Sequence, residues 1–128
     1  MRRNRQSGRA ILETALVLGA FMTMLIALID VAQYLFVHAS LAERVRAAAR
    51  LGAESSPVNP ALIRTWVSSA GFHLTPDNVQ VVELGAGTED RRLEVRIVNY
   101  EYTTISPAMA GFRKAKPIVA SVPLGVNH

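Results

Sequence analysis

The chain has 128 residues, half of them hydrophobic, with no cysteine and a formal net charge of +4. This length allows one small domain, and the lack of cysteine excludes disulfides, a thiol nucleophile and cysteine metal sites. Four of the 14 Lys and Arg residues lie within the first nine positions, so the remaining ten balance the ten Asp and Glu. The charge therefore marks a basic N-terminal tip, not the basic stripe across a folded face that nucleic-acid binding needs.

The first predicted element is a membrane-spanning helix. From Ala10 to Ile29 the one ionisable residue is Glu13. About twenty helical residues span about 30 Å, the thickness of a hydrocarbon core. The arginine-rich flank predicts that the N-terminus stays in the cytoplasm and that the chain after the span is exported. The first expected partner is thus the lipid bilayer.

Glu13 is the unusual feature of this span. A carboxylate in the membrane costs about 2.5 kcal/mol or more on insertion scales, so it needs a partner or a functional reason. The alternative is that Glu13 reaches the cytoplasmic interface beside Arg9, its i,i+4 neighbour. At the other end of the span we expect Asp30 to be solvated near the outer interface, with pairing to a partner helix as the alternative.

Three fates compete for this segment. A secretory signal peptide would be cut before Ser40, where Val37-His38-Ala39 fits the small-residue rule. The length of the apolar stretch, the charge of Asp30 and the unbroken helical periodicity argue against that cut. An uncleaved anchor leaves Glu13 unexplained. The third fate is cleavage on the cytoplasmic side, after Gly8.

The helix is predicted to continue past the membrane to Glu54, because no proline occurs before Pro57. We therefore divide it into a transmembrane half, residues 9–30, and an exported half, residues 31–54. Spacings of three and four in the exported half define an apolar stripe that must be buried. This predicted stripe comprises Val31, Leu35, His38, Leu41, Val45, Ala48 and Gly52. On the opposing polar edge, Arg46 and Arg50 are expected to be solvated or to face a sheet.

Residues 57–128 are predicted to form a small exported α+β domain. Asn59-Pro60 has the pattern of an N-cap followed by proline at the first helical position, and it starts a short helix through Ala70. The buried side of this short helix is expected to comprise Ile63, Trp66 and Val67.

Strands are predicted over residues 78–84, 93–97 and 118–122, forming an antiparallel sheet that receives the apolar stripe. Residues 85–90 are predicted to be a loop, and residues 108–116 a basic loop. A change in the alternation near Ile97 and Val98 suggests a β-bulge. The expected fold class is α+β, a long N-terminal transmembrane and amphipathic helix packed on a small antiparallel β-sheet.

An ordered set of motifs runs along the N-terminal helix: Gly8, Ala10, Glu13, Ala15-Leu16-Val17-Leu18, Asp30, Tyr34 with Phe36, and Ala48-Ala49-Arg50-Leu51-Gly52-Ala53. This set, and the small sheet that follows, resemble the TadE-like pseudopilins of the Tad (tight adherence, Flp pilus) assembly system, which have a pilin-like fold. The resemblance covers about residues 7–53, and beyond them it is architectural.

This resemblance implies a function in pilus assembly. A prepilin peptidase would remove the basic leader, residues 1–8, by cutting after Gly8, and the new α-amine of Arg9 would meet Glu13 of a neighbouring subunit. Asp30 and Arg50 are secondary candidates. The implied partners are sibling pseudopilins, the major Flp pilin, and the inner-membrane platform and ATPase of the machine. The implied location is the cytoplasmic membrane or the pilus.

Functions of other classes remain as alternatives. The chain could be an uncleaved, membrane-anchored binding module, or a tip adhesin. We expect the chain to be non-enzymatic and to hold no cofactor. We also expect no metal site, because no two of His38, His73 and His128 have metal-ligand spacing. The stretch Gly85-Ala86-Gly87 lacks the helix that follows a phosphate-binding loop, so we expect it to be a hairpin loop.

Overall fold

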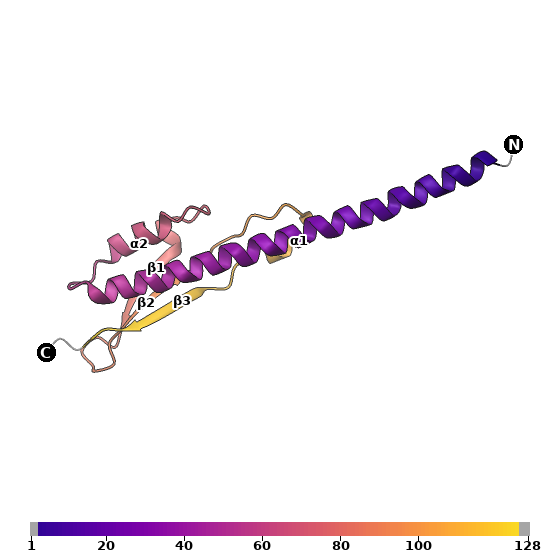
Figure 1. Cartoon of the computed structure of the whole chain (residues 1–128). Coiled ribbons are helices and arrows are strands. Elements are labelled where there is room, and N and C mark those ends of the chain that lie inside the picture. Colours follow the sequence, from indigo (N-terminus) through magenta and orange to yellow (C-terminus); the bar gives the residue numbers. More distant parts are fainter. Residues whose placement is uncertain (1–2, 126–128) are drawn as a thin grey trace.

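The fold consists of one long helix and a small domain that packs against its C-terminal half (Figure 1). The computed structural model describes residues 3–125, so Met1 and Arg2 of the predicted leader, and His128, lie outside the described residues. Helix α1 runs unbroken over Arg3–Glu54. Its N-terminal half extends away from the rest of the chain, and its C-terminal half lies against the domain. The predicted continuous helix is therefore confirmed.

The domain consists of a short helix and a three-stranded antiparallel sheet in the order β1-β2-β3. This arrangement confirms the predicted α+β fold class. The elements are α2 (Pro60–Ser68), β1 (Val79–Leu84), β2 (Arg92–Ile97) and β3 (Ile118–Pro123), with short 3₁₀ helices η1 (Pro76–Asn78) and η2 (Pro107–Phe112).

The core lies between the sheet and α1. On the central strand β2, Leu93, Val95 and Ile97 are buried, and the residues between them are partly exposed. This period of two is the alternation that the sequence shows, and it places one apolar face of the sheet against the helix. Full burial of each such side chain stabilises the fold by about 1.5–3 kcal/mol. Helix α1 contacts β2 and β3 directly.

The apolar stripe on α1 is confirmed from His38 onward and is wrong at Val31 and Leu35. His38 is half-buried, and its Nδ1 lies 3.0 Å from the Tyr102 hydroxyl oxygen. Leu41, Val45, Ala48 and Gly52 are buried. The two earlier members of the predicted stripe are exposed, Val31 at 41% and Leu35 at 59%. The positions that contact the domain there are instead Asp30, Tyr34 and Val37, at spacings of four and three. A search for apolar periodicity does not find this line of contact positions on α1, because its first two members are a carboxylate and a tyrosine.

Gly52 lies where α1 approaches both α2 and β2. A Cβ atom on Gly52 would lie 2.4 Å from Cδ2 of Leu93 and 2.7 Å from Cδ1 of Ile63. Replacing Gly52 with valine is therefore expected to lower the free energy of unfolding by about 1–3 kcal/mol, because an overpacked core must shift. Denaturant unfolding of the full chain in detergent, followed by Trp66 fluorescence, measures this change.

The control for the Gly52 variant is Arg50→Ala on the same turn of α1. Arg50 is exposed, so its removal is expected to change the free energy of unfolding by less than about 0.5 kcal/mol. Equal effects of the two substitutions would contradict the close approach at Gly52.

Two local predictions are corrected by the structure. Strand β2 ends at Ile97, and Asn99 has a φ of 53°. The change in the apolar alternation near Val98 therefore marks the end of a strand, and the predicted bulge is wrong.

Helix α2 begins as predicted, but one of its side chains does not lie where we expected. The predicted cap at Asn59 is confirmed, since its side chain accepts a hydrogen bond from the Leu62 N–H at 3.2 Å. Trp66, however, is 36% exposed, and the Arg44 guanidinium lies 5.4 Å from its ring centroid.

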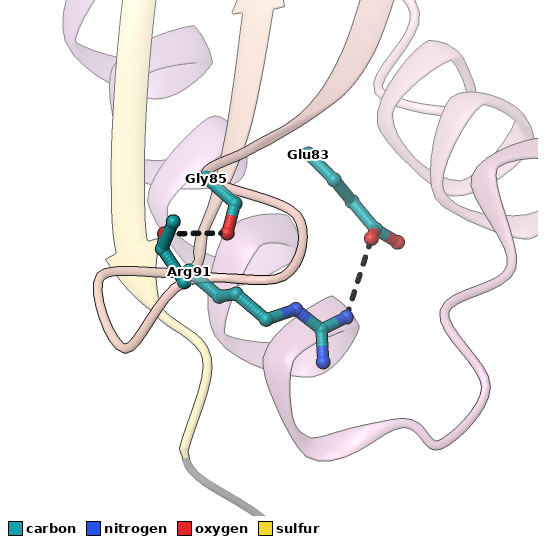
Figure 2. A network of polar contacts seen from close by, with 4 residues as sticks. Glu83, Gly85 and Arg91 are labelled. Atoms are coloured by element: carbon teal, nitrogen blue, oxygen red, sulfur yellow. Dashed lines mark hydrogen bonds and ion pairs between the residues drawn. The ribbon is translucent and has the colours of Figure 1, made fainter.

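The loop between β1 and β2 is a hairpin, as predicted (Figure 2). The N–H and the hydroxyl of Thr88 both donate to the carbonyl oxygen of Gly85, at 3.0 and 2.8 Å. Gly85 has a φ of +72°, a conformation that favours glycine. At the base of the loop Arg91 and Glu83 form an ion pair at 3.4 Å. These contacts account for the Gly85-Ala86-Gly87 stretch as turn chemistry.

Candidate functional site

The free half of α1 presents large apolar side chains to its surroundings on all sides. Among the described residues, one helix, Gly8–Glu54, is long and apolar enough to cross a membrane. An exposed apolar surface of this extent indicates contact with lipid or with other helices. Its large exposed side chains are Ile11, Leu12, Leu16, Val17, Leu18, Phe21, Met22, Met24, Leu25, Ile26, Leu28 and Ile29.

Within the described apolar run, residues 10–29, the helix provides hydrogen-bond partners for the threonine side chains but not for Glu13. The hydroxyl of Thr14 donates to the carbonyl of Ala10, and that of Thr23 to the carbonyl of Gly19, both at 2.9 Å. Such bonds to the preceding turn make a hydroxyl tolerable in an apolar environment. A carboxylate only accepts hydrogen bonds, so the carbonyls of its own helix cannot serve it.

Gly8 and Arg9 lie one turn before Glu13 on the same helix. Arg9 and Glu13 are i,i+4 neighbours and both are exposed. In the part of the chain that the structure describes, no ion pair joins them. The carboxylate of Glu13 is therefore available to a group from outside this chain.

Asp30, at the far end of the apolar run, contradicts our expectation of a solvated side chain. It is 3% exposed. Its Oδ1 accepts from the Ile105 N–H at 2.8 Å, and its Oδ2 accepts from the Ser106 N–H at 2.7 Å. Both carboxylate oxygens thus bind the backbone immediately before η2. Hydrogen bonds of this kind, with a charged acceptor, are among the stronger ones in proteins.

An aromatic cluster joins α1 to the segment after β2. The ring of Tyr34 lies 4.4 Å from that of Tyr102, which lies 5.0 Å from that of Tyr100. Nδ1 of His38 is 3.0 Å from the Tyr102 hydroxyl oxygen, and the Tyr100 hydroxyl donates to the Phe72 carbonyl at 2.7 Å. Tyr100 and Tyr102 are buried in the core, and the cluster continues the packing from Asp30 toward Leu41.

The buried tyrosines make the domain sensitive to alkali. Burial, and then the neighbouring Tyr34 and Tyr100, raise the pKa of Tyr102 from 10.0 to about 12. The folded state therefore holds this proton more tightly than the unfolded state does, and stability present below pH 10 is lost as the pH rises toward 12. Ultraviolet difference absorbance of tyrosinate should show a step near pH 12 that Tyr102→Phe removes. A Tyr102 step that stays near pH 10 would contradict this packing.

The other candidate positions lie on the surface. Arg46 and Glu43 form an exposed ion pair at 3.0 Å, a type that contributes little to stability. Arg50 is exposed on the same edge, so the solvated edge is confirmed and Arg50 joins no cluster. Within residues 3–125, no group of three His, Cys, Asp or Glu is placed to hold a metal ion.

Comparison with known families decides the resemblance. Residues 8–50 match the family described as TadE-like protein. Over these residues, helix α1 is similar to TadE-like proteins. The match begins at Gly8, includes Glu13 and Asp30, and ends at Arg50, so it covers every candidate position on α1. No curated protein and no solved structure matches the chain.

The TadE-like match confirms the predicted resemblance and supports involvement in the Tad pilus. It also links the chain to the machinery of that pilus in general terms. Residues 51–125, which include α2 and the sheet, lie outside the matched segment.

Sequence reasoning missed the two hydrogen bonds that the Asp30 carboxylate accepts from the Ile105 and Ser106 N–H groups, which we name the Asp30 clasp. The acidic residue itself was visible in the TadE-like pattern, but its partners are backbone groups that have no sequence signature.

Proposed function

We propose that the chain is a non-enzymatic minor pilin, or pseudopilin, that takes part in assembling a Tad (Flp) pilus. Residues 9–30 anchor it in the cytoplasmic membrane with the N-terminus inside, and the α+β domain is exported. One observation carries the proposal: a TadE-like helix extends its apolar run clear of the domain, and that run, residues 10–29, contains one carboxylate, Glu13. Free apolar helices of this kind are suited to pack against each other in a bundle.

The proposed chemistry begins with processing. A prepilin peptidase hydrolyses the peptide bond after Gly8 and leaves Arg9 with a free α-amine. In an assembled bundle this ammonium group pairs with Glu13 of a neighbouring subunit. An ion buried in an apolar bundle costs several kcal/mol unless it is paired, so the pair selects one register between adjacent helices. Sibling pseudopilins and the major Flp pilin supply the neighbours, and the platform and ATPase of the machine drive the assembly.

The geometry of α1 favours this reading over a cleaved signal peptide. A cut before Ser40 would separate Asp30, Tyr34 and His38 from the domain. All three contact the segment after β2, through two backbone hydrogen bonds, a ring contact and a contact with a hydroxyl group. Removal of these contacts would expose the buried tyrosines, so retention of the helix supports a stable domain.

An uncleaved, anchored binding module is the competing function, and a complementation experiment separates the two. The strain lacking the gene is complemented with the wild type, with Gly8→Leu, or with the hairpin variant Glu89→Gln/Asp90→Asn. Surface pili are counted by electron microscopy. A Cβ atom at Gly8 would meet nothing within 4 Å, so Gly8→Leu tests processing without disturbing the fold.

We expect the deletion and Gly8→Leu to lose pili, and the hairpin variant to restore them. An anchored binding module predicts the reverse: Gly8→Leu complements fully, and substitution of the exposed loop abolishes function. A tip adhesin predicts that both variants fail, with pili still present in the hairpin variant but no adhesion. Full pilus formation without this chain would reject the proposal.

A further inference from the structure

The segment Thr103–Lys116, which we name the exit loop, is held at the point where α1 leaves its apolar run. Asp30 directly follows the run that ends at Ile29. Its carboxylate binds the backbone N–H groups of Ile105 and Ser106. In Figure 1 the chain between β2 and β3 runs along α1 toward the free half of the helix. If residues 10–29 fill the hydrocarbon core, the exit loop therefore lies at the outer membrane surface.

The exposed side chains of the exit loop suit that position. Ile105 is 62% exposed and Phe112 is 66% exposed, although both are large apolar residues. They are followed by three exposed cations, Arg113, Lys114 and Lys116. The exit loop contains no Asp or Glu. Apolar side chains beside basic ones are the combination that binds the boundary between acyl chains and anionic headgroups.

A groove between the exit loop and α1 combines the same two chemistries. Its lining includes the apolar side chains of Val31, Met109 and Phe112, together with Lys114 and Lys116. Val31 follows Asp30, so the groove opens just above the apolar run. The acid nearest in sequence is Glu101, which pairs with Lys114 across an isolated backbone bridge and is exposed.

We propose that the exit loop docks on the anionic phospholipid surface of the membrane that α1 crosses. Ile105 and Phe112 enter the interface, and Arg113, Lys114 and Lys116 contact headgroup phosphates. The two hydrogen bonds from Asp30 transmit this contact to the helix, so the domain is held at a fixed height and orientation relative to the membrane. The inference rests on the proposed membrane span but not on the proposed role in the pilus.

The absence of cysteine makes the experiment direct, because single cysteines can be introduced and labelled with an environment-sensitive NBD fluorophore. The full chain is labelled at Phe112→Cys and reconstituted in vesicles of neutral phosphatidylcholine, or in vesicles with about a third anionic phosphatidylglycerol. Leu84→Cys is the matched control, because Leu84 is an exposed apolar residue at the hairpin end of β1. Leu18→Cys reports on the span itself.

We expect the label at position 112 to be several-fold brighter and blue-shifted in anionic vesicles, and the label at position 84 to stay in water. Substituting glutamine for Arg113, Lys114 and Lys116 together should remove the difference between anionic and neutral vesicles. A label at position 112 that stays in water, or that is equally buried in both kinds of vesicle, overturns the inference. Burial of position 112 that rises with the protein-to-lipid ratio also overturns it, in favour of a neighbouring copy.

The label at Leu18 separates this failure from failure of the span. If position 18 is buried in lipid and position 112 is in water, the exit-loop inference alone is rejected, and the anchored helix stands. If position 18 is also in water, the span is wrong and both proposals fall.

Discussion

Replacing Glu13 with alanine is expected to abolish pilus assembly while leaving the chain in the membrane. In the variant, the α-amine of a neighbouring subunit would be buried without a counter-ion. Removal of one partner from a buried ion pair costs about 3–5 kcal/mol, which corresponds to a loss of more than about a hundredfold in the assembly equilibrium. Alanine also relieves the cost of inserting a carboxylate, so the amount of membrane-bound chain should not fall. Immunoblots of sheared pili and of membrane fractions measure both quantities.

The control for Glu13 is Thr14→Ala in the same turn. The Thr14 hydroxyl bonds the carbonyl of its own helix, so its loss should leave assembly near the wild-type level. Glu13→Gln keeps the size and removes the charge, and we expect it to fail as alanine does. Normal assembly with glutamine would show that charge is not required, and would restore the reading in which Glu13 only reaches toward the interface beside Arg9.

Replacing Asp30 with alanine is expected to detach the exit loop from α1. The two N–H groups that Asp30 binds would lose their bonds to the carboxylate, one bond buried and the other part-buried, at a combined cost of about 3 kcal/mol. That cost corresponds to exchange about a hundredfold faster at the amides of Ile105 and Ser106. Hydrogen exchange of the full chain in detergent, resolved by residue, measures the effect. The core amides of β2 should be much less affected.

Asp90→Ala serves as the matched control, because Asp90 is an exposed carboxylate in the hairpin loop. Asp30→Asn keeps one acceptor oxygen, so it should fall between alanine and the wild type. Protection of Ile105 and Ser106 that survives in Asp30→Ala would contradict the clasp, and the height of the exit loop would then need another explanation.

Much of the fold could be predicted because its signals are local. The lack of proline before Pro57 predicted the unbroken helix, and Asn59-Pro60 predicted the start of α2. The alternation over 93–97 predicted β2 and its buried face. These features act through neighbouring backbone bonds and side-chain periods, which a single sequence displays directly.

What failed depended on contacts between distant parts of the chain. Asp30 is a charged residue type that is usually exposed to solvent. It is buried here because residues 105 and 106, distant in sequence, pack against it. Trp66 was expected on the buried side of α2 together with Ile63 and Val67. Those two residues are buried, but Trp66 lies at the surface beside Arg44. Val31 and Leu35 fit the apolar period, yet the contact path along α1 passes through Tyr34 and Val37 instead.

The candidate site was easier to predict than the clasp. Glu13 stands out because inserting a carboxylate into a membrane costs free energy, and a charged residue within an apolar run is recognisable from the sequence alone. Gly8 is recognisable by its place between the basic leader and that run. The partner expected for Glu13 belongs to another subunit, so the single chain shows only that its own helix does not satisfy the carboxylate.

The measurement that tests the central claim most directly is the mass of the mature N-terminus, with and without the cognate prepilin peptidase. We predict a chain that starts at Arg9 when the peptidase is present and retains its leader when the peptidase is absent. A chain that keeps Met1, or starts at Arg2, in both strains would contradict the pseudopilin account and favour the anchored binding module. A start at Ser40 would identify a secreted protein and remove the role of Glu13 altogether.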